Sequence, residues 1–251
     1  MSELARRLQN PSARVSPRFL LSRRDDIHTT GFSSQFGYVN RQLNRMVRDL
    51  MLDSDLPDGA KILDYGCADR PYLELLPDGA EYIGVDLPGN PKADLQLTAN
   101  GTIPLPPETV DLVLSTQVLE HVEDPAGYLA ECARVLRPGG KLLLSTHGIM
   151  YYHPDPADYW RWTCAGLRRV VEHQGFEVVT LRGLLGLIAA SLQLIQDATA
   201  WKVPRPVRRL YVPLMQILIV LADRFDSDVG RAANSWTIAI LASKPDEAQR
   251  G

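Results

Sequence analysis

The sequence is poor in cysteine, in excess positive charge and in long apolar runs, and each shortage narrows the possibilities. Its three cysteines, Cys67, Cys132 and Cys164, show neither paired nor metal-ligand spacing, which argues against a disulfide framework and favours a reducing, cytoplasmic location. A net charge of −3 at pH 7 gives no general attraction to polyanions, so we expect no nucleic-acid partner. A small or neutral substrate is favoured.

No apolar run is long enough for a membrane-spanning helix, which needs about 20 residues. The two longest candidates, 184–195 and 210–222, are shorter and are interrupted by polar residues or proline, so we expect no transmembrane segment. An export signal is not expected either, because Arg23 and Arg24 are followed by two aspartates and a polar run.

The chain's 251 residues fit one α/β domain with additions. Residues 1–55 are predicted to form an N-terminal arm and helix, and residues 56–251 the main domain with a helical insertion at 184–228. Six arginines in the first 26 residues predict a solvated arm or, alternatively, an arm that orders over an anionic partner or the active site. Apolar residues at helical spacing predict an amphipathic helix over 35–51.

The chain is organised around the apolar run 61–65, which passes into a loop beginning at Gly66. A second run, 81–86, ends in Asp86, 20 residues after Gly66, which is the distance at which a neighbouring strand offers a carboxylate to ribose hydroxyls. The pattern therefore predicts a buried parallel strand, a nucleotide-binding loop and a following helix.

The glycine positions of this loop decide what kind of nucleotide fits. A dinucleotide site has glycine at the first, third and sixth loop positions, where this chain has Gly66, Ala68 and Pro71. Without the third glycine the close contact between helix and strand is lost, and Pro71 suits the first turn of a helix. The loop is better matched to a nucleoside without phosphates.

Further along, short apolar runs alternate with helical stretches, as a doubly wound parallel sheet requires. We expect strands at 61–65, 81–86, 110–115, 141–146, 176–181 and 236–242, the last two antiparallel by the resemblance described next. A helix is expected to begin at Asp124-Pro125 and to end at Pro138-Gly139-Gly140.

Segments 111–122, with Leu-Glu-His, and 134–144, with Arg-Pro-Gly-Gly, follow the loop and Asp86 in order. Together they resemble class I S-adenosylmethionine-dependent methyltransferases of the type 11-like kind, from about residue 61 to 182. The resemblance implies an α/β, Rossmann-like, doubly wound seven-stranded sheet with an N-terminal helical arm and a helical insertion before the last strand. It also implies S-adenosylmethionine as the cofactor. The chain departs from many members at Ala68 and Arg70, where they have glycine.

The resemblance assigns roles at the carboxyl ends of the strands, where open α/β sheets bind ligands. Asp64 helps to hold the ammonium group, Gly66 lets the backbone approach the methionine part, and Asp86 accepts both ribose hydroxyls. Segment 94–96 lies beside the adenine. The predicted cofactor-binding residues are Asp64, Gly66, Asp86, Leu87, Leu95, Thr116 and Gln117.

Methyl transfer from a sulfonium needs alignment and exclusion of water, but a hydroxyl acceptor also needs a general base, for which histidine is suited. His147 directly follows the fourth apolar run and is the preferred base. The other catalytic candidates are His153 and Asp155 in the next loop, while His121 in Leu-Glu-His supports the cofactor pocket by resemblance. The alternative for each histidine is a hydrogen-bonded structural role.

The loop from 151 to 163 mixes aromatic rings with charged groups, which suits sugars. Similar segments occur in family members associated with polysaccharide or natural-product sugar methylation, and elsewhere they anchor the following helix. The predicted substrate-binding residues are Tyr152, Tyr159, Trp160, Arg161 and Trp162. A divalent cation such as magnesium is a further possibility, with the candidate ligands His147, His153, Asp155 and Asp158.

We therefore expect an S-adenosylmethionine-dependent O-methyltransferase that acts on a sugar, an oligosaccharide or a similar polyhydroxylated small molecule. The alternatives are another small-molecule or lipid-linked acceptor, a nicotinamide-dependent oxidoreductase, or a binding protein that keeps the fold without turnover. The two apolar stretches of the insertion, separated by the basic segment 202–209, predict two helices that pack on the core, join two subunits of a homodimer or close over the substrate. Of the possible roles for the two helices, contact with a membrane surface is the least favoured.

Overall fold

Seven strands form one mixed sheet in the order β3-β2-β1-β4-β5-β7-β6. The computed structural model describes residues 30–154 and 157–246, so most of the predicted N-terminal arm lies outside the described residues. The strands are β1 (Lys61–Tyr65), β2 (Glu81–Asp86), β3 (Leu95–Gln96), β4 (Val110–Thr116), β5 (Leu136–His147), β6 (Glu177–Leu184) and β7 (Thr237–Ser243).

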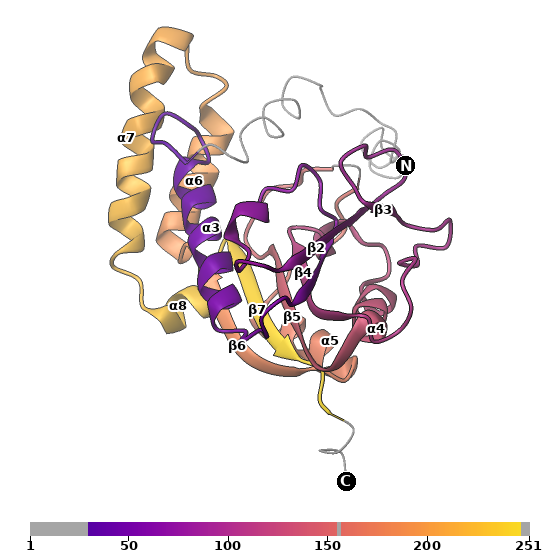
Figure 1. Ribbon diagram of the computed structural model, residues 1–251. Helices are drawn as coiled ribbons and strands as arrows, with labels where there is room; N and C mark the ends of the chain where they lie inside the picture. The colour runs from indigo at the N-terminus through magenta and orange to yellow at the C-terminus, as the bar shows by residue number, and fades with distance from the viewer. Residues whose placement is uncertain (1–29, 155–156, 247–251) are drawn as a thin grey trace, which may run out of the picture.

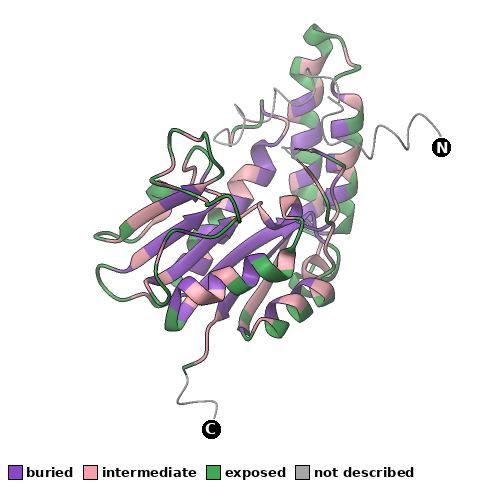
Figure 2. Cartoon of the chain, turned by 90° about the vertical axis from the view of Figure 1, so that its right-hand side faces the viewer, coloured by how far each residue is buried: buried purple, intermediate pink, exposed green. Residues whose placement is uncertain are grey.

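The sheet confirms the expected Rossmann-like architecture. β1 pairs in parallel with β2 and β4, while β7 pairs antiparallel with both β5 and β6. The central strands are buried over most of their length (Figure 2), because both faces of a largely parallel sheet are covered. The carboxyl ends of β1, β2, β4 and β5 meet at one edge and bring Tyr65, Asp86, Thr116 and His147 to it.

Helices cover the sheet and form the insertion. They are α3 (Gly37–Leu52), α4 (Pro125–Val135), α5 (Cys164–His173), α6 (Leu187–Thr199), α7 (Arg205–Asp223) and α8 (Asp228–Ala233), with the single 3₁₀ turns η1 (Leu73–Leu75) and η2 (Leu119–His121). The side chain of Asp124 caps α4 by accepting from the Gly127 amide, and Thr163 caps α5 in the same way through the Gly166 amide.

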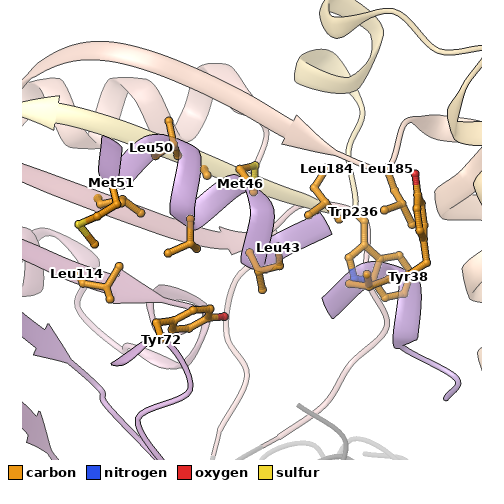
Figure 3. Packing of buried hydrophobic residues seen from close by; sticks show 14 of the residues in the cluster. Tyr38, Leu43, Met46, Leu50, Met51, Tyr72, Leu114, Leu184, Leu185 and Trp236 are labelled. Carbon is orange, nitrogen blue, oxygen red and sulfur yellow. The ribbon is translucent and has the colours of Figure 1, made fainter. Parts of the chain in front are cut away.

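The predicted helix over 35–51 is present as α3, and its apolar face is part of the main core. Leu43, Met46 and Leu50 are buried there together with Leu114 and Trp236. Figure 3 shows these side chains converging from α3, the sheet and the segment before β7. The helix and the sheet therefore share one core, and the boundary proposed at residue 55 stays a prediction.

Three sequence expectations about local structure are wrong. The loop after β1 leads into η1 instead of an α-helix, because Leu76 precedes Pro77 and adopts an extended conformation (ψ 151°) that stops the turn. Residues 66–80 and 87–109, all of them described, form no α-helix. The Leu-Glu-His segment is the 3₁₀ turn η2, and α4 ends at Val135, so that Pro138-Gly139-Gly140 lies within β5.

The helical insertion lies between β6 and β7, the last two strands, as predicted. α6 and α7 form a hairpin, and α3 lies between this hairpin and the sheet (Figure 1). Among the described residues, no helix combines the length and the apolar character that crossing a membrane requires.

Candidate functional site

A cavity of about 1250 Å³ opens at the carboxyl edge of β1, β2, β4 and β5, beneath the first turns of α3. Most of the predicted cofactor and catalytic residues line it. These are Asp64, Gly66, Asp86, Leu87, Thr116, Gln117, His147 and His153. The cavity therefore has a cofactor end near β1 and β2 and, beside His147, a second end that we call the acceptor end.

The loop after β1 has three residues with positive φ, of which only Gly66 is a glycine. Gly66 has φ +87°, and a Cβ at this residue would lie 2.5 Å from Cγ2 of Val118, so no side chain fits. Ala68 (φ 42°) and Arg70 (φ 59°) also adopt left-handed conformations. The amides of Gly66 and Cys67 both donate to the carbonyl of Val85, which fixes the loop against β2. Ala68 and Arg70, where many family members have glycine, thus take up left-handed conformations that favour glycine.

The Asp86 carboxylate lies at the end of β2 and is surrounded by donors. It accepts hydrogen bonds from the amides of Ala68 (3.0 Å) and Leu87 (2.7 Å) and from Nδ2 of Asn90 (2.6 Å). A carboxylate offers about four acceptor positions. Three of these positions are taken, so two ribose hydroxyls could bind Asp86 only if the hydrogen bond from Asn90 Nδ2 were broken.

Asp64 is buried in β1, and the Tyr82 hydroxyl donates to it at 2.8 Å. Burial, with a smaller contribution from neighbouring Asp86, raises the pKa of Asp64 to about 7, although the bond from Tyr82 opposes the shift. An ammonium group beside Asp64 would favour the ionised form. The position is therefore suited to the role implied by the resemblance.

The other predicted cofactor residues divide into those that reach the cavity and one that does not. Gln117 lies at its wall in a left-handed conformation (φ 58°), and its Nε2 donates to Ser145 Oγ at 2.9 Å. Leu95 lies in the edge strand β3 and packs on the core, and it is Leu97, two residues later, that lines the cavity. Leu95 itself stays an untested prediction.

At the acceptor end, a buried carboxylate and a buried imidazole form a pair. Nε2 of His147 lies 2.9 Å from Oε1 of Glu120, and the Thr146 hydroxyl donates to the other Glu120 oxygen at 2.8 Å. Burial alone would raise the pKa of Glu120, but His147 more than offsets it and lowers that pKa to about 2. Glu120 is therefore ionised and can stabilise an imidazolium.

Three histidine rings meet at this end of the cavity. The ring of His153 lies edge-on to those of His121 and His147, with centroids 4.9 Å and 4.8 Å away. Nδ1 of His121 contacts the carbonyl of Ala157. The predicted catalytic residue Asp155 lies outside the described residues. His147 and His153 therefore share one wall with His121, which sequence reasoning had assigned to cofactor support.

The candidate metal ligands differ from those expected. Among the described residues, Glu120, His121 and His153 each offer a ligand atom within 4.8 Å of the others. Asp158 accepts two bonds from the Arg161 guanidinium, both 2.6 Å, instead. Two imidazoles with one carboxylate suit transition-metal ions better than magnesium, which prefers oxygen ligands.

The loop from 151 to 163 lies beside the cavity and is held in place by hydrogen bonds and ion pairs of its own side chains. Burial alone would raise the pKa of Asp158, but Arg161 and His153 hold that pKa well below its usual range. Arg161 also donates to the carbonyls of Met150 and Tyr151, and Nε1 of Trp160 donates to the carbonyl of Val122. Much of this loop therefore serves to hold its own shape.

The predicted substrate residues consequently do not line the main cavity. A separate pocket of about 190 Å³ is formed by several of them, namely Tyr152, Tyr159, Trp160 and Arg161 with Met150 and Asp158. Trp162 packs against the core under α5, and its amide donates to the His147 carbonyl. Binding of a substrate by these residues stays a prediction.

Sequence reasoning missed Glu120, Asn90 and Leu97. Glu120 stands between Leu119 and His121 in a short turn, and a carboxylate that is buried there needs a charged partner, which was a usable signal. Asn90 and Leu97 gave no such signal, because their positions follow from the irregular chain after β2.

Part of the chain is similar in sequence to known methyltransferases. A family model described as a methyltransferase domain matches residues 36–190. A protein of Mycolicibacterium smegmatis named "Probable S-adenosylmethionine-dependent methyltransferase" is 32% identical over 142 residues, which are 50% of this chain and 55% of that protein. A ubiquinone biosynthesis O-methyltransferase of Photobacterium profundum is 36% identical over 103 residues, 35% of this chain and 44% of that protein. The chain thus spans about half the length of these curated relatives.

Solved structures share the fold at low identity. The [4+2]-cyclase SpnF has a TM-score of 0.55 and 17% identity, covering 86% of this chain and 84% of its own. Haemonchus contortus phosphoethanolamine N-methyltransferase 2, in complex with S-adenosyl-L-methionine, has a TM-score of 0.51 and 16% identity, covering 80% of this chain and 53% of its own. These likenesses concern the fold alone.

Proposed function

Because the chain belongs to the methyltransferase-domain family, we propose that it transfers the methyl group of S-adenosylmethionine to a hydroxyl of a small molecule. The observation that carries this proposal is the buried pair of Glu120 and His147 at the end of the cavity opposite Asp86. A positioned imidazole beside an ionised carboxylate is a general base, which a hydroxyl acceptor needs. The names of the ubiquinone O-methyltransferase relatives support an oxygen acceptor.

The residues at the cofactor end fit the proposed cofactor. Asp86 offers a carboxylate to a ribose, Asp64 an acid to an ammonium group, and Gly66 a backbone without a side chain. Bound S-adenosylmethionine supplies a methyl group that its sulfonium already activates. The chain then has to align the acceptor, exclude water and remove one proton.

We assign proton removal to His147. Its imidazole would take the hydroxyl proton as the acceptor oxygen bonds to the methyl carbon and the carbon–sulfur bond of the donor breaks, and Glu120, 2.9 Å from Nε2, would stabilise the resulting imidazolium. Thr146 fixes the second oxygen of Glu120, so the carboxylate cannot rotate away. His121 and His153 line the same wall and orient the acceptor in this proposal.

For the acceptor we propose a saccharide or a similar polyhydroxylated molecule. The rings of Tyr152, Tyr159 and Trp160 are partly solvent-exposed around the smaller pocket, and flat apolar faces with polar groups between them suit sugar rings. Tyr151, next in the chain to Tyr152, lines the main cavity, so one segment borders both spaces.

Two measurements test the proposal. Calorimetry compares S-adenosylhomocysteine with a nicotinamide dinucleotide, and we expect clear binding of the first alone. Mass spectrometry then follows S-adenosylmethionine with panels of saccharides and of simple alcohols, and we expect the mass gain of one methyl group in the saccharide panel. Preferential dinucleotide binding would overturn the methyltransferase assignment, and a product of unchanged mass would point to a different reaction on this fold, as the name of SpnF illustrates.

A further inference from the structure

The α6–α7 hairpin buries several polar side chains beside its small and apolar ones, and it exposes many apolar side chains to solvent. On α6, Gln193, Gln196 and Asp197 are buried, whereas Leu187 and Ile188 are exposed. A surface helix of a soluble protein normally shows the opposite arrangement. Exposed residues run along both helices of the hairpin in Figure 2.

The apolar residues of α7 form a stripe along its outer side. They recur every three or four residues, which places them on one face of the helix. Within α7 the stripe consists of Val207, Leu210, Leu214, Ile217, Leu218 and Leu221, with Leu210 exposed by 78%, and Phe225, exposed by 87%, follows just after the helix ends at Asp223. At 1.5 Å per residue the helical part extends about 21 Å. A contiguous apolar face of this size marks an interaction surface.

Hydrogen bonds on the inner side fix this orientation. The carbonyl of Gln35 accepts from the side chains of Gln193 (3.1 Å), Gln196 (2.7 Å) and Gln216 (3.0 Å). The amide of Tyr38 donates to Gln216, and its hydroxyl donates to Asp223. Rotating either helix to bury its leucines would break this buried network, so the apolar stripe is a stable feature of the fold. Because both helices contact the segment 35–38, their outer faces lie on the same side of the hairpin.

The charge of the hairpin is of one sign at its tip. Lys202 lies in the turn between the helices, and Arg205, Arg208 and Arg209 lie in the first turns of α7, near Trp201, which is 64% exposed. In residues 187–222, all of them described, the one acid is Asp197, and it is buried. The exposed charge of this segment is therefore entirely positive.

We propose that the α6–α7 hairpin docks on the surface of an anionic phospholipid bilayer, with the apolar stripe at the boundary between headgroups and acyl chains and the basic turn among the lipid phosphates. Exposed leucines, a tryptophan and clustered cations are the combination that interfacial helices use. A second copy of the chain would offer this hairpin the same face, which holds no exposed acid in 187–222 for the four cations. Charge complementarity thus favours lipid phosphate over a homodimer.

The docking does not depend on the proposed reaction, but it would serve it. Phe36 and Val39 line the main cavity, and they lie on either side of Tyr38 in the segment that the hairpin binds. The hairpin that would contact the bilayer therefore binds a segment that also borders the cavity.

Co-sedimentation of the full chain with vesicles tests the proposal directly. We expect binding to vesicles of phosphatidylcholine with phosphatidylglycerol, and weaker binding to phosphatidylcholine alone or at high salt. The double variant Leu210→Glu/Leu214→Glu should lose affinity by about tenfold for each leucine. A matched control, Leu52→Glu/Val179→Glu, adds the same charge at two exposed apolar residues outside the hairpin and should bind like the native protein. Thermal melts verify folding of all variants.

A second variant, Arg205→Gln/Arg209→Gln, should abolish the preference for phosphatidylglycerol. Absence of vesicle binding by the native chain, or undiminished binding by the leucine variant, would overturn the proposal. So would binding that disappears when the arginines of residues 1–29 are replaced while the leucine variant still binds. A dimer in light scattering that the leucine variant dissociates, with no vesicle binding, would show that a second copy occupies this face. None of these readouts requires turnover, so they stand apart from the test of the proposed function.

Discussion

The two ends of the cavity are built in different ways. The cofactor end comes from one stretch of chain, 64–97, and backbone amides supply much of its hydrogen bonding. The acceptor end combines η2, the end of β5 and the loop before α5, and it buries charged side chains such as Glu120 and Asp158. The cofactor end is thus built from residues close together in the sequence. The acceptor end is built from residues far apart in the sequence, whose buried charges pair with one another. Changes at the first should therefore alter affinity, and changes at the second should alter rate.

The largest effect is expected at the acceptor end. His147→Ala should lower the rate of methyl transfer by about 10² to 10⁴, the range for a positioned general base, with nearly unchanged affinity for S-adenosylhomocysteine. Single-turnover kinetics measure the rate and calorimetry the affinity. His173→Ala, at an exposed histidine of α5, is the matched control. Normal turnover of the His147 variant together with failure of a His121 or His153 variant would move the base to one of those rings.

At the cofactor end, Asp86→Ala should weaken binding of S-adenosylhomocysteine by about 100-fold or more, since two charge-assisted hydrogen bonds worth about 1.5 to 3 kcal/mol each are lost. The fold should survive, because the carboxylate is partly exposed. Calorimetry measures the change, and Asp58→Ala, at an exposed acid between α3 and β1, controls for the loss of charge. Near-normal affinity in the Asp86 variant would show that another group holds the ribose.

The same contrast explains what could be predicted from sequence. Gly66 and Asp86 were placed at the cavity because spacing within one stretch reports which strand ends are neighbours. Glu120 lies in η2 and was missed because its partner, His147, is 27 residues further on at the end of β5, so that only the fold brings them to 2.9 Å. The helix predicted after β1 is absent because Pro77 keeps Leu76 extended. This effect is local and visible in the sequence, but the prediction followed the expected alternation of strands and helices instead.

The hairpin shows a further limit of sequence reasoning. Periodicity identifies the apolar and polar faces of α6 and α7, but it does not say which face points inward. The default assumption buries the apolar face. Here the carbonyl of Gln35, far away in the sequence, binds three glutamine side chains and holds them on the inner side, which leaves many leucines exposed. No spacing within the insertion reports that partner.

An effect on stability is expected at Asp64. Burial raises its pKa from 3.8 to about 7, so the folded chain keeps a proton that the unfolded chain loses, and stability falls as pH rises between these values. Asp64→Asn removes this cost and should increase the free energy of unfolding at pH 8 on the order of 4 kcal/mol, with a smaller gain at pH 5. Urea denaturation at both pH values measures it, with Asp58→Asn as the exposed control. An equal gain at both pH values would contradict a raised pKa.

The smallest effect is expected at the wall of the cofactor end. The sequence predicts Leu95 as the cofactor-binding leucine there, whereas in the structure Leu97 lines the cavity. Leu95 and Leu97 both pack against the same core cluster, and Leu97 also lines the cavity. Replacing a half-buried leucine contact costs about 1 kcal/mol, so Leu97→Ala should weaken S-adenosylhomocysteine binding by about fivefold. Leu95→Ala, a matched change two residues away, should lose a similar amount of folding stability and keep its affinity. Calorimetry and urea denaturation on the pair separate the two properties. If Leu95→Ala weakened binding more than Leu97→Ala, the adenine would lie against β3, as the resemblance implied.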